Sequence, residues 1–179
     1  MSGSAIVRGM TSWDDASLDE RAELSRAVYP PEEAAAWPGR HIEWSTPEWG
    51  VAVRDDGGRL VSFAALYLRD SSHDGAAIVI GGVGAVMTHP DHRGQGYAQL
   101  AMSAAVGFFA AQRADFGLLV CEKQLIPYYE RLGWVVFEGE LVTLQRGEPE
   151  VFSFNRVMMI EVAGAAPRHG VIDLNGRPW

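Results

Sequence analysis

Two glycines in the segment Arg93-Gly94-Gln95-Gly96 stand directly before an alanine-rich apolar stretch with helical spacing. The first N–H groups of a helix have no partner inside it, and the helix dipole makes that end electropositive. Glycines without a Cβ let a phosphate approach the backbone, and Arg93 can add a charge-assisted hydrogen bond. The segment therefore predicts an anion-binding loop, although a tight strand-to-helix turn can have the same composition.

Two familiar phosphate-binding motifs do not account for this loop. The chain contains no GxxxxGK[ST], which argues against a nucleoside triphosphatase. It also lacks GxGxxG with an acidic residue about twenty positions later, the arrangement expected of a dinucleotide-binding fold. An anion site of another kind is therefore expected.

The loop belongs to a longer pattern, V-x-x-x-P-x-x-R-G-x-G-x-A, which begins at Val86 and ends at Ala98. A second motif, LIPYYERLGW at 125–134, has the form of a short helix ended by Gly133. In this order and spacing, the two motifs resemble those of the GNAT superfamily of acetyl-CoA-dependent N-acetyltransferases. The resemblance covers about residues 78–138, and the strand order outside it is compatible with the same fold.

The resemblance implies that acetyl-CoA lies in a gap between a strand ending at Thr88 and a strand ending near Glu122. Backbone amides of 93–98 would hold the pyrophosphate, the backbone of 86–88 would pair with the pantetheine arm, and an N–H near Val86 or Met87 would stabilise the oxyanion. The run Gly81-Gly82-Val83-Gly84 favours a bulge that opens the gap, or serves close packing, or both. The implied cofactor-binding residues are Val86, Met87, Thr88, Arg93, Gly94, Gln95, Gly96, Tyr97 and Ala98.

Direct attack of an amine on a thioester needs a neutral amine, a stabilised oxyanion and a proton for the departing thiolate. The resemblance makes Tyr129 the proton donor, although a phenol with a pKa of about 10 is a weaker acid than a thiol with a pKa of about 8.5. Tyr128 and Tyr129 are adjacent on a helix, so only one of them can point at the thioester. The other would pack the helix onto the sheet. The alternative is that both tyrosines only pack the helix and neither donates a proton.

The general base is less well defined by the sequence. Many relatives carry a glutamate on the fourth strand, whereas 78–88 contains no carboxylate. Glu122 is the nearest alternative, and it can equally be a solvated charge at a strand end. Cys121 is interpreted as a small core residue rather than a covalent nucleophile. His89 and His92 are expected to contact solvent or CoA, and no grouping of His, Cys and Asp has metal-ligand spacing, so no metal is expected.

The end of the chain, HGVIDLNGRPW, resembles the tail of the aminoglycoside 2′-N-acetyltransferases, which also closes on an aspartate and a terminal tryptophan. In that group carboxylates, including the terminal one, hold the sugar amines. The resemblance implies that the tail 163–179 contributes to the acceptor site, together with a Glu- and Trp-rich segment at 27–49. Aromatic faces and carboxylates suit a polycationic ring-bearing substrate, while packing tryptophans and solvated glutamates are the alternative. The implied acceptor residues are Glu32, Glu33, Asp173 and Trp179.

The elements that must position these groups predict an α/β fold with a mixed sheet. A capping box of Ser17 and Glu20 would open a helix that continues through Tyr29. Since strand, helix and strand between 76 and 122 form a right-handed crossover, those two strands should be parallel inside an otherwise antiparallel sheet with helices on both faces. Strands are expected at 5–10, 49–55, 60–70, 76–88 and 116–122 and twice more between 134 and 162, and helices after Pro31, after the glycine loop and at 125–133.

Length and composition limit the function classes. At 179 residues, with 47% hydrophobic residues and a formal charge of -8, the chain is expected to form a single GNAT domain over 1–179. The negative charge argues against nucleic acid and favours a small cationic amine. No apolar stretch predicts a membrane span or a secretory signal, and the lone Cys121 fits a reducing cytoplasm. The sequence leaves open whether the chain forms a homodimer.

We therefore expect a cytoplasmic N-acetyltransferase that moves acetyl from acetyl-CoA to a primary amine of a small cationic acceptor. An aminoglycoside, and hence antibiotic resistance, is one such case. An acetyltransferase acting on a protein N-terminus or lysine is one alternative. A non-catalytic acyl-CoA-binding regulatory module is the other, motivated by the missing base on the fourth strand.

Overall fold

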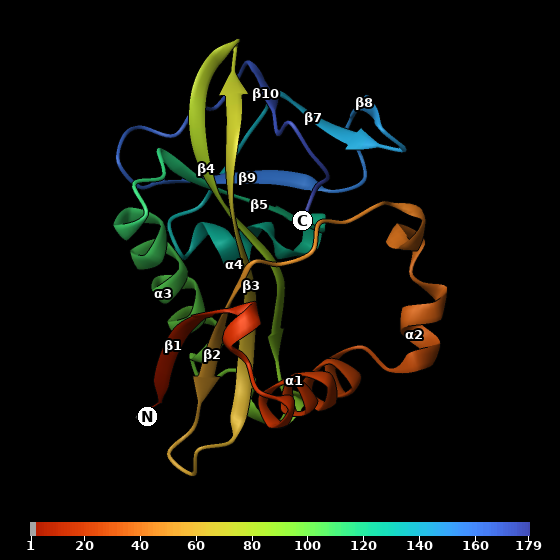
Figure 1. Ribbon diagram of the computed structural model, residues 1–179, viewed down its shortest axis with the longest axis vertical. Coiled ribbons are helices and arrows are strands. Elements are labelled where there is room, and N and C mark those ends of the chain that lie inside the picture. Colours follow the sequence, from red (N-terminus) through yellow and green to blue (C-terminus); the bar gives the residue numbers. More distant parts are fainter. Residues whose placement is uncertain (1–2) are drawn as a thin grey trace.

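The computed structural model describes residues 3–179 and has one mixed sheet with helices on both of its faces (Figure 1). Four α-helices are present in this part of the chain: α1 (Asp15–Val28), α2 (Pro31–Ala36), α3 (Tyr97–Ala111) and α4 (Ile126–Glu130). The strands are β1 (Ser4–Gly9), β2 (Trp49–Arg54), β3 (Leu60–His73), β4 (Ala76–Thr88), β5 (Phe116–Cys121), β6 (Val135–Val136), β7 (Glu140–Gln145), β8 (Glu148–Val151), β9 (Arg156–Glu161) and β10 (Val171–Asp173). The predicted fold class is confirmed.

Strand β3 organises the sheet because it is long enough to pair with three neighbours. The main strand order is β6-β9-β5-β4-β3-β10-β7-β8. Strand β4 pairs with β3 along nearly its whole length, while β2 and β10 pair with the first and last parts of its other edge. β1 continues the sheet from β2.

The predicted parallel pair is present: β4 and β5 run parallel, with Ile80 opposite Phe116 and Val83 opposite Leu119. A second parallel pair, β10 with β7, was not expected from the sequence. It arises because the tail after β9 returns to the sheet and fills the edge of β3 that β2 leaves free. This insertion holds the last ten residues against the middle of the sheet.

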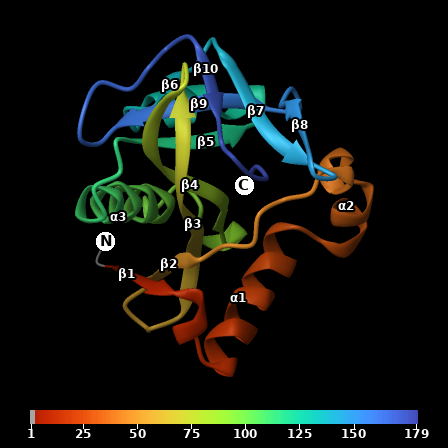
Figure 2. The same ribbon diagram turned by 45° about the horizontal axis from the view of Figure 1, so that its top comes forward.

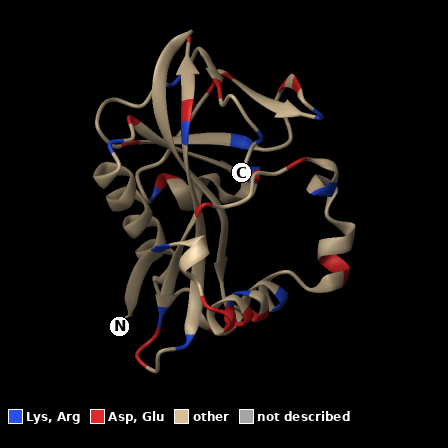
Figure 3. Ribbon diagram, viewed as in Figure 1, with Lys and Arg blue, Asp and Glu red and all other residues tan. Residues whose placement is uncertain are grey.

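The two faces of the sheet carry separate hydrophobic clusters under different helices. The cluster on one face includes Ala101, Ala105 and Phe109 of α3, and the cluster on the other face includes Leu24 of α1. Figure 2 shows α3 and α1 on opposite sides of β3 and β4. Helix α3 carries no charged side chain, as Figure 3 shows, because apolar and alanine residues make most of it a packing surface.

The start of α1 differs from the prediction. Asp14 is its N-cap and accepts a hydrogen bond from the Ser17 N–H at 2.9 Å, so the capping box of Ser17 and Glu20 does not form. Glu20 instead forms an ion pair with Arg54 of β2 at 2.5 Å. The helix ends at Val28, one residue before the predicted end at Tyr29, which is its C-cap and precedes the two prolines.

The region after α4 is also more divided than predicted. The two expected strands between 134 and 162 are resolved into β6, β7, β8 and β9. Turns interrupt the apolar pattern, among them Arg146-Gly147, where both residues have positive φ. Strand β10 was missed because it has only three residues. Within residues 3–179, no helix has the length and apolarity needed to cross a membrane.

Candidate active site

The candidate site is the place where β4 and β5 stop pairing. Their ladder ends at Val83 and Leu119, yet β4 continues to Thr88 and β5 continues to Cys121. Beyond that point β4 still pairs with β3, and β5 still pairs with β9. Each strand therefore presents one edge without a strand partner, and the two edges face a common gap.

A bulge in β4 lies at the start of this gap. Gly84 pairs with Ala65 and Met87 pairs with Phe63, so Ala85 and Val86 together oppose a single residue of β3. Ala85 has a φ of 45°, which is uncommon for a residue with a side chain. The sequence placed a bulge within 81–84, and the structure places it directly after that run.

The glycines of β4 serve close packing instead. A Cβ on Gly81 would lie 2.3 Å from the Phe109 ring of α3, and a Cβ on Gly82 would lie 2.3 Å from the Trp179 ring. The two glycines therefore let a helix and the tail approach the same strand from opposite faces. Close packing was the second of the two interpretations that the sequence allowed for these glycines, the other being a bulge.

Main-chain groups line the β4 side of the gap. The His89 N–H donates to Val61 O of β3 at 2.9 Å, so by alternation Thr88 turns its main-chain groups away from β3. Met87 pairs with Phe63 of β3, whereas Val86 belongs to the bulge. Val86 and Thr88 are therefore better placed than Met87 to offer backbone groups to a ligand in the gap.

The loop that opens α3 lies next to these groups. Gly94 and Gly96 have φ values of 73° and 82°, and a Cβ on either would meet no atom within 4 Å. Gly96 is the N-cap of α3, so the N–H groups of Tyr97 and Ala98 have no acceptor inside the helix. Arg93 donates from Nε to Thr88 O at 3.4 Å, which keeps the loop beside the end of β4. The loop therefore has the open backbone that an anion site requires, and the binding role of 93–98 stays a prediction.

Tyr129 lies on the β5 side of the gap. It is 7% exposed, and burial, followed by the nearby Cys121, raises its pKa well above the ordinary range of a phenol. The Tyr128 and Tyr129 rings meet edge to face with centroids 5.1 Å apart, and burial raises the pKa of Tyr128 as well. The Tyr128 hydroxyl is buried without a hydrogen-bond partner among residues 3–179. The raised pKa values keep both tyrosines protonated at neutral pH, so each has a proton to donate.

Tyr29 joins this group from the other face of the sheet, and the sequence did not single it out. It is the C-cap of α1 and keeps 46% of its surface exposed. Desolvation and the negative charge of Glu122 nevertheless raise its pKa, while Arg93 acts against this rise, and Tyr29 in turn raises the pKa of Tyr129. Tyr29 is thus close enough to Tyr129, Glu122 and Arg93 for their charges to interact. The useful sequence pattern was the pair of prolines directly after Tyr29, which fixes it at the helix end.

Glu122 follows β5 and is exposed, and it accepts a hydrogen bond from Gln124 Nε2. Cys121 differs from it sharply. It is 4% exposed, its Sγ lies 3.6 Å from Met158 Sδ, and burial, with Glu122, raises the pKa of its thiol to about 11. Cys121 is therefore a protonated core residue, in line with the reading from sequence.

The two histidines of the loop have partners of their own. His89 Nδ1 lies 3.3 Å from the Asp91 N–H, and its Nε2 lies 3.2 Å from an Arg59 guanidinium nitrogen. The His92 ring packs edge-on against Tyr97 at 5.9 Å. These contacts give both rings a local role in shaping the loop.

The tail reaches the gap from the face opposite α3. The Trp179 ring is 5% exposed, stacks on Tyr67 at 5.3 Å and donates from Nε1 to Leu118 O at 3.2 Å. The Arg69 guanidinium covers the same ring at 5.1 Å. The main-chain carbonyl carbon of Trp179 lies 3.1 Å from the position of a Cβ on Gly84, at the start of the gap.

The carboxylates predicted to bind the acceptor do not gather around this tail. Asp173 accepts the Asn175 N–H at 2.8 Å within its own turn, beside Ser72 of β3. Glu32 and Glu33 lie exposed in the first turn of α2. Their binding role stays a prediction, and no described contact joins them to the gap.

The aromatic residues of 27–49 are divided between two places. The Trp37 and Trp44 rings stack with centroids 5.6 Å apart, and Phe154 meets Trp37 edge-on at 5.8 Å. Trp49 packs instead against Phe108 of α3 at 5.4 Å. Only the first two tryptophans therefore remain beside the face that the tail occupies.

Fold and site together define a class of proteins in which a mixed sheet opens between two parallel strands beside an anion-binding helix start. The chain belongs to the GNAT acetyltransferases: the family model described as "Acetyltransferase (GNAT) domain" matches residues 10–137, more than half of the chain. No curated protein sequence matches it.

Solved structures share the fold at low sequence identity. Escherichia coli ElaA is 18% identical with a TM-score of 0.62, over 89% of this chain and 100% of that one. The E. coli GNAT family N-acetyltransferase YhbS, in complex with CoA, is 13% identical with a TM-score of 0.60, over 95% and 89%. A GNAT family acetyltransferase of Brucella melitensis, in complex with acetyl-CoA, is 14% identical with a TM-score of 0.56, over 94% of both chains.

Proposed function

We propose that the protein transfers an acetyl group from acetyl-CoA to a primary amine of a small acceptor. The observation that carries this proposal is the gap between β4 and β5, with an anion-binding loop at one of its ends and a buried tyrosine at its side. The CoA-containing structures of YhbS and the Brucella protein support the choice of cosubstrate by analogy of fold.

In the proposed complex, the N–H groups of 94–98 hold the pyrophosphate and the backbone of Val86 and Thr88 pairs with the pantetheine arm. The pantetheine amides would thereby take the place of the missing strand pairing between β4 and β5. The thioester would then lie near Ala85 and Val86, where the bulge directs main-chain groups into the gap. The Val86 N–H is the proposed donor to the oxyanion.

The chemical step forms a bond between the amine nitrogen and the thioester carbon, and then breaks the bond between carbon and sulfur. The electron pair of that bond leaves on sulfur, and Tyr129 stabilises the thiolate with its hydroxyl proton. Because burial raises the pKa of Tyr129, this phenol is a poor acid but stays fully protonated. Tyr129 therefore acts as a hydrogen-bond donor to the departing sulfur. The proton that the attacking nitrogen loses as the amide forms passes to the thiolate through Tyr129 or water, so that CoA leaves as the thiol and Tyr129 ends protonated.

The acceptor arrives mostly as ammonium and must lose a proton before attack. Glu122 is the proposed acceptor of that proton, directly or through water, because it is the carboxylate whose charge reaches Tyr29 and Cys121 at the gap. Tyr29 stands on the side of the sheet that the tail occupies, where an amine could enter opposite the cofactor loop. It is proposed to orient the amine.

The acceptor itself remains a proposal. A cationic acceptor such as an aminoglycoside would be held by carboxylates of the tail and of α2. Near the tail, Glu43 is paired with Arg177 at 3.1 Å and accepts the Arg146 N–H at 3.1 Å. The charge of Glu48 acts on Arg69, whose guanidinium covers the Trp179 ring. Both carboxylates thus already lie near an arginine of the protein, and the proposal specifies the acceptor only by its amine.

Two measurements on the purified protein test the proposed function. Calorimetry should detect binding of CoA and acetyl-CoA, and thiol release should depend on an added amine from a panel of aminoglycosides, polyamines, amino acids and peptides. Absence of binding at millimolar concentration would overturn the proposal. Binding without thiol release for any amine would support the regulatory module, and release only with peptides would support the protein acetyltransferase.

A further inference from the structure

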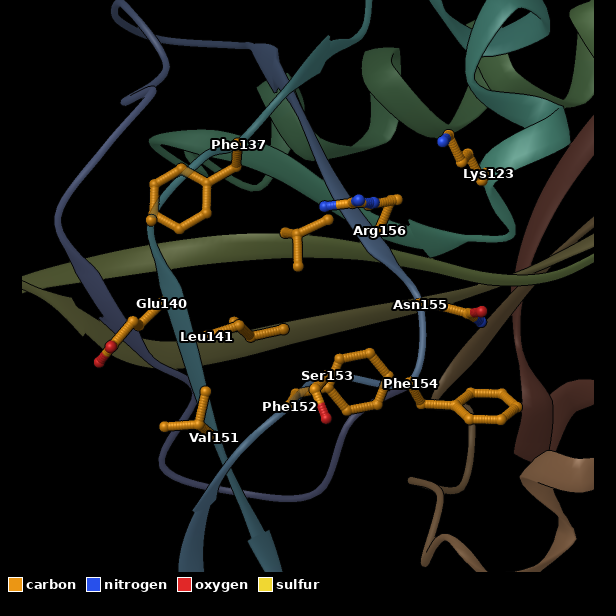
Figure 4. A pocket seen from close by; sticks show the side chains of 12 residues that line it. Lys123, Phe137, Glu140, Leu141, Val151, Phe152, Ser153, Phe154, Asn155 and Arg156 are labelled. Atoms are coloured by element: carbon orange, nitrogen blue, oxygen red, sulfur yellow. The ribbon is translucent and has the colours of Figure 1, made fainter.

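A pocket of 410 Å³ lies on the face of the sheet opposite α3 (Figure 4). Its floor includes Phe137, Leu141 and Val157, which belong to the same hydrophobic cluster as Trp179. Its rim comes from Lys123 after β5 and from 151–156 between β8 and β9. The pocket therefore opens on the side from which an acceptor, rather than the cofactor loop, approaches the gap.

The pocket adjoins the end of β5. Lys123 follows Glu122 directly, and Arg156 is the β9 residue opposite Cys121. These positions lie beyond Leu119, where β5 has already separated from β4. Lys123 thus follows the β5 edge of the gap in which the thioester is proposed to lie, and Arg156 lies one strand away, across β5 from that gap.

Lys123 and Arg156 are unpaired. Neither side chain forms an ion pair or a hydrogen bond with any of residues 3–179. In Figure 4 the Arg156 guanidinium extends across the pocket, whereas the Glu140 side chain points outward from it. Lys123 is also the only lysine of the chain, whose formal charge is -8. Two free cations at one pocket of an acidic protein offer a site for an anion.

The remaining lining is apolar and aromatic. Phe152 and Phe154 come from the segment before β9, and their rings also meet Trp44 edge-on at 6.1 and 6.5 Å. The stacked pair of Trp37 and Trp44 thereby supports this wall from behind. A ligand held here would combine an anionic group with an apolar body.

We infer that the acceptor of this enzyme is an amine that also carries a carboxylate, with an apolar or aromatic body between or beside the two groups. The inference rests on the proposed function, because it assigns the acceptor of the same site. Arg156 and Lys123 bind the carboxylate in the pocket, and the amine extends toward Glu122 and the gap. A purely cationic acceptor would place positive charge against the two unpaired cations.

Turnover with matched amines tests the inference. L-phenylalanine carries the carboxylate and phenethylamine lacks it, while spermidine represents a polycation. In the wild-type protein, kcat/KM for L-phenylalanine should exceed that for phenethylamine by at least tenfold. In the double variant Lys123→Gln, Arg156→Gln the ratio should fall toward one, and comparing ratios between proteins removes the difference in basicity of the two amines.

The control Arg113→Gln removes one positive charge just after the end of α3, outside the pocket, and should leave the ratio unchanged. Equal or better turnover of phenethylamine or spermidine by the wild type would overturn the inference. So would a ratio that survives the double variant, or a double variant that raises KM for acetyl-CoA instead of the amine. The last result would assign the two cations to a CoA phosphate.

A binding measurement separates this inference from the proposed function. Calorimetry with 3-phenylpropionate, a carboxylate without an amine, should detect binding to the CoA-loaded wild type and at least tenfold weaker binding to the double variant. If 3-phenylpropionate binds in this way but no amine is acetylated, the pocket assignment holds and the proposed reaction fails. If 3-phenylpropionate does not bind at millimolar concentration, the inference fails whatever the enzyme acetylates.

Discussion

The loop 93–98 and the tail 175–179 approach the gap between β4 and β5 from opposite faces of the sheet, and they are built differently. The loop offers main-chain groups of consecutive residues, and two glycines with positive φ and open space around them set its shape. The tail is held by side chains from distant segments, such as Arg69 and Tyr67 of β3. The proposed cofactor side can therefore persist in many sequences, whereas the proposed acceptor side changes with each side chain that supports it.

The largest expected effect is at the contact between the tail and the sheet. Trp179→Ala should lower the free energy of unfolding by about 4 kcal/mol, because a buried aromatic ring is lost over a glycine that cannot fill the space. Urea denaturation measures the change. Trp37→Ala is the matched control, since Trp37 is 37% exposed and should cost less than half as much. Equal losses would remove the distinction between the two tryptophans.

Tyr129 lies beside Cys121 at the end of β5, on the gap that both regions approach, and its substitution tests the proposed chemistry. Tyr129→Phe should lower kcat about 100-fold by removing the proton offered to the thiolate. The Kd for CoA from calorimetry should stay within about twofold, because the ring and its packing remain. Tyr128→Phe removes the neighbouring hydroxyl as a control. If Tyr128→Phe reduced kcat more than Tyr129→Phe, the assignment of the two tyrosines would be reversed.

The loop can be tested apart from the tail with a pair of glycines. Gly96 and Gly75 have φ values of 82° and 83°, and neither would meet another atom through a Cβ. Valine at either position should cost similar backbone strain, about 1–2 kcal/mol. Only Gly96→Val should also weaken CoA binding, by about tenfold in calorimetry. A similar loss of CoA affinity in Gly75→Val would show that strain, and not the loop, determines binding.

The smallest effect concerns Cys121. Burial, followed by the charge of Glu122, raises the pKa of the folded Cys121 thiol from its ordinary value of 9.0 to about 11, so the folded state retains the proton while the unfolded chain releases it as pH rises. Stability is therefore fully present below pH 9 and declines between pH 9 and 11, by about 1 kcal/mol at pH 10. Between pH 9 and 11 the urea midpoint of the wild type should fall more steeply with pH than that of Cys121→Ala.

Tyr67, whose pKa burial raises to about 12, contributes the same kind of decline above pH 10 in both proteins. Parallel curves for wild type and Cys121→Ala would show that the thiol does not titrate as proposed. A covalent role for Cys121 would instead appear as loss of kcat in Cys121→Ala at neutral pH, where the structure predicts near-normal turnover.

The sequence was sufficient for the parts of the site that depend on local backbone chemistry. The two loop glycines, the crossover between β4 and β5 and the helix carrying Tyr129 all follow from short-range patterns, and the structure contains each of them. The bulge was misplaced by only a few residues. Glycine in a strand can reflect either bending or close contact, and at Gly81 and Gly82 the contacts with Phe109 and Trp179 decided the matter.

The acceptor side could not be predicted in the same way because it joins residues far apart in the chain. Lys123, Arg156 and Phe152 have no shared motif, and they meet only because β9 pairs with β5 and β8 precedes it. Tyr29 became relevant through the position of α1 against the sheet. Glu20 was assigned to a helix cap, whereas Arg54 of β2 attracts it in the folded protein. Long-range pairing overrode local propensity in each case.

Since β4 and β5 separate after Val83 and Leu119, the middle of the sheet has two free edges that only a bound molecule can bridge. A molecule that binds the native chain alone raises its stability by RT ln(1 + [L]/Kd), about 2.7 kcal/mol at a hundredfold excess over Kd. Melting temperature and resistance to proteolysis should therefore track the surrounding acyl-CoA level. The lifetime of the enzyme in the cell would then rise and fall with the supply of its own acyl donor.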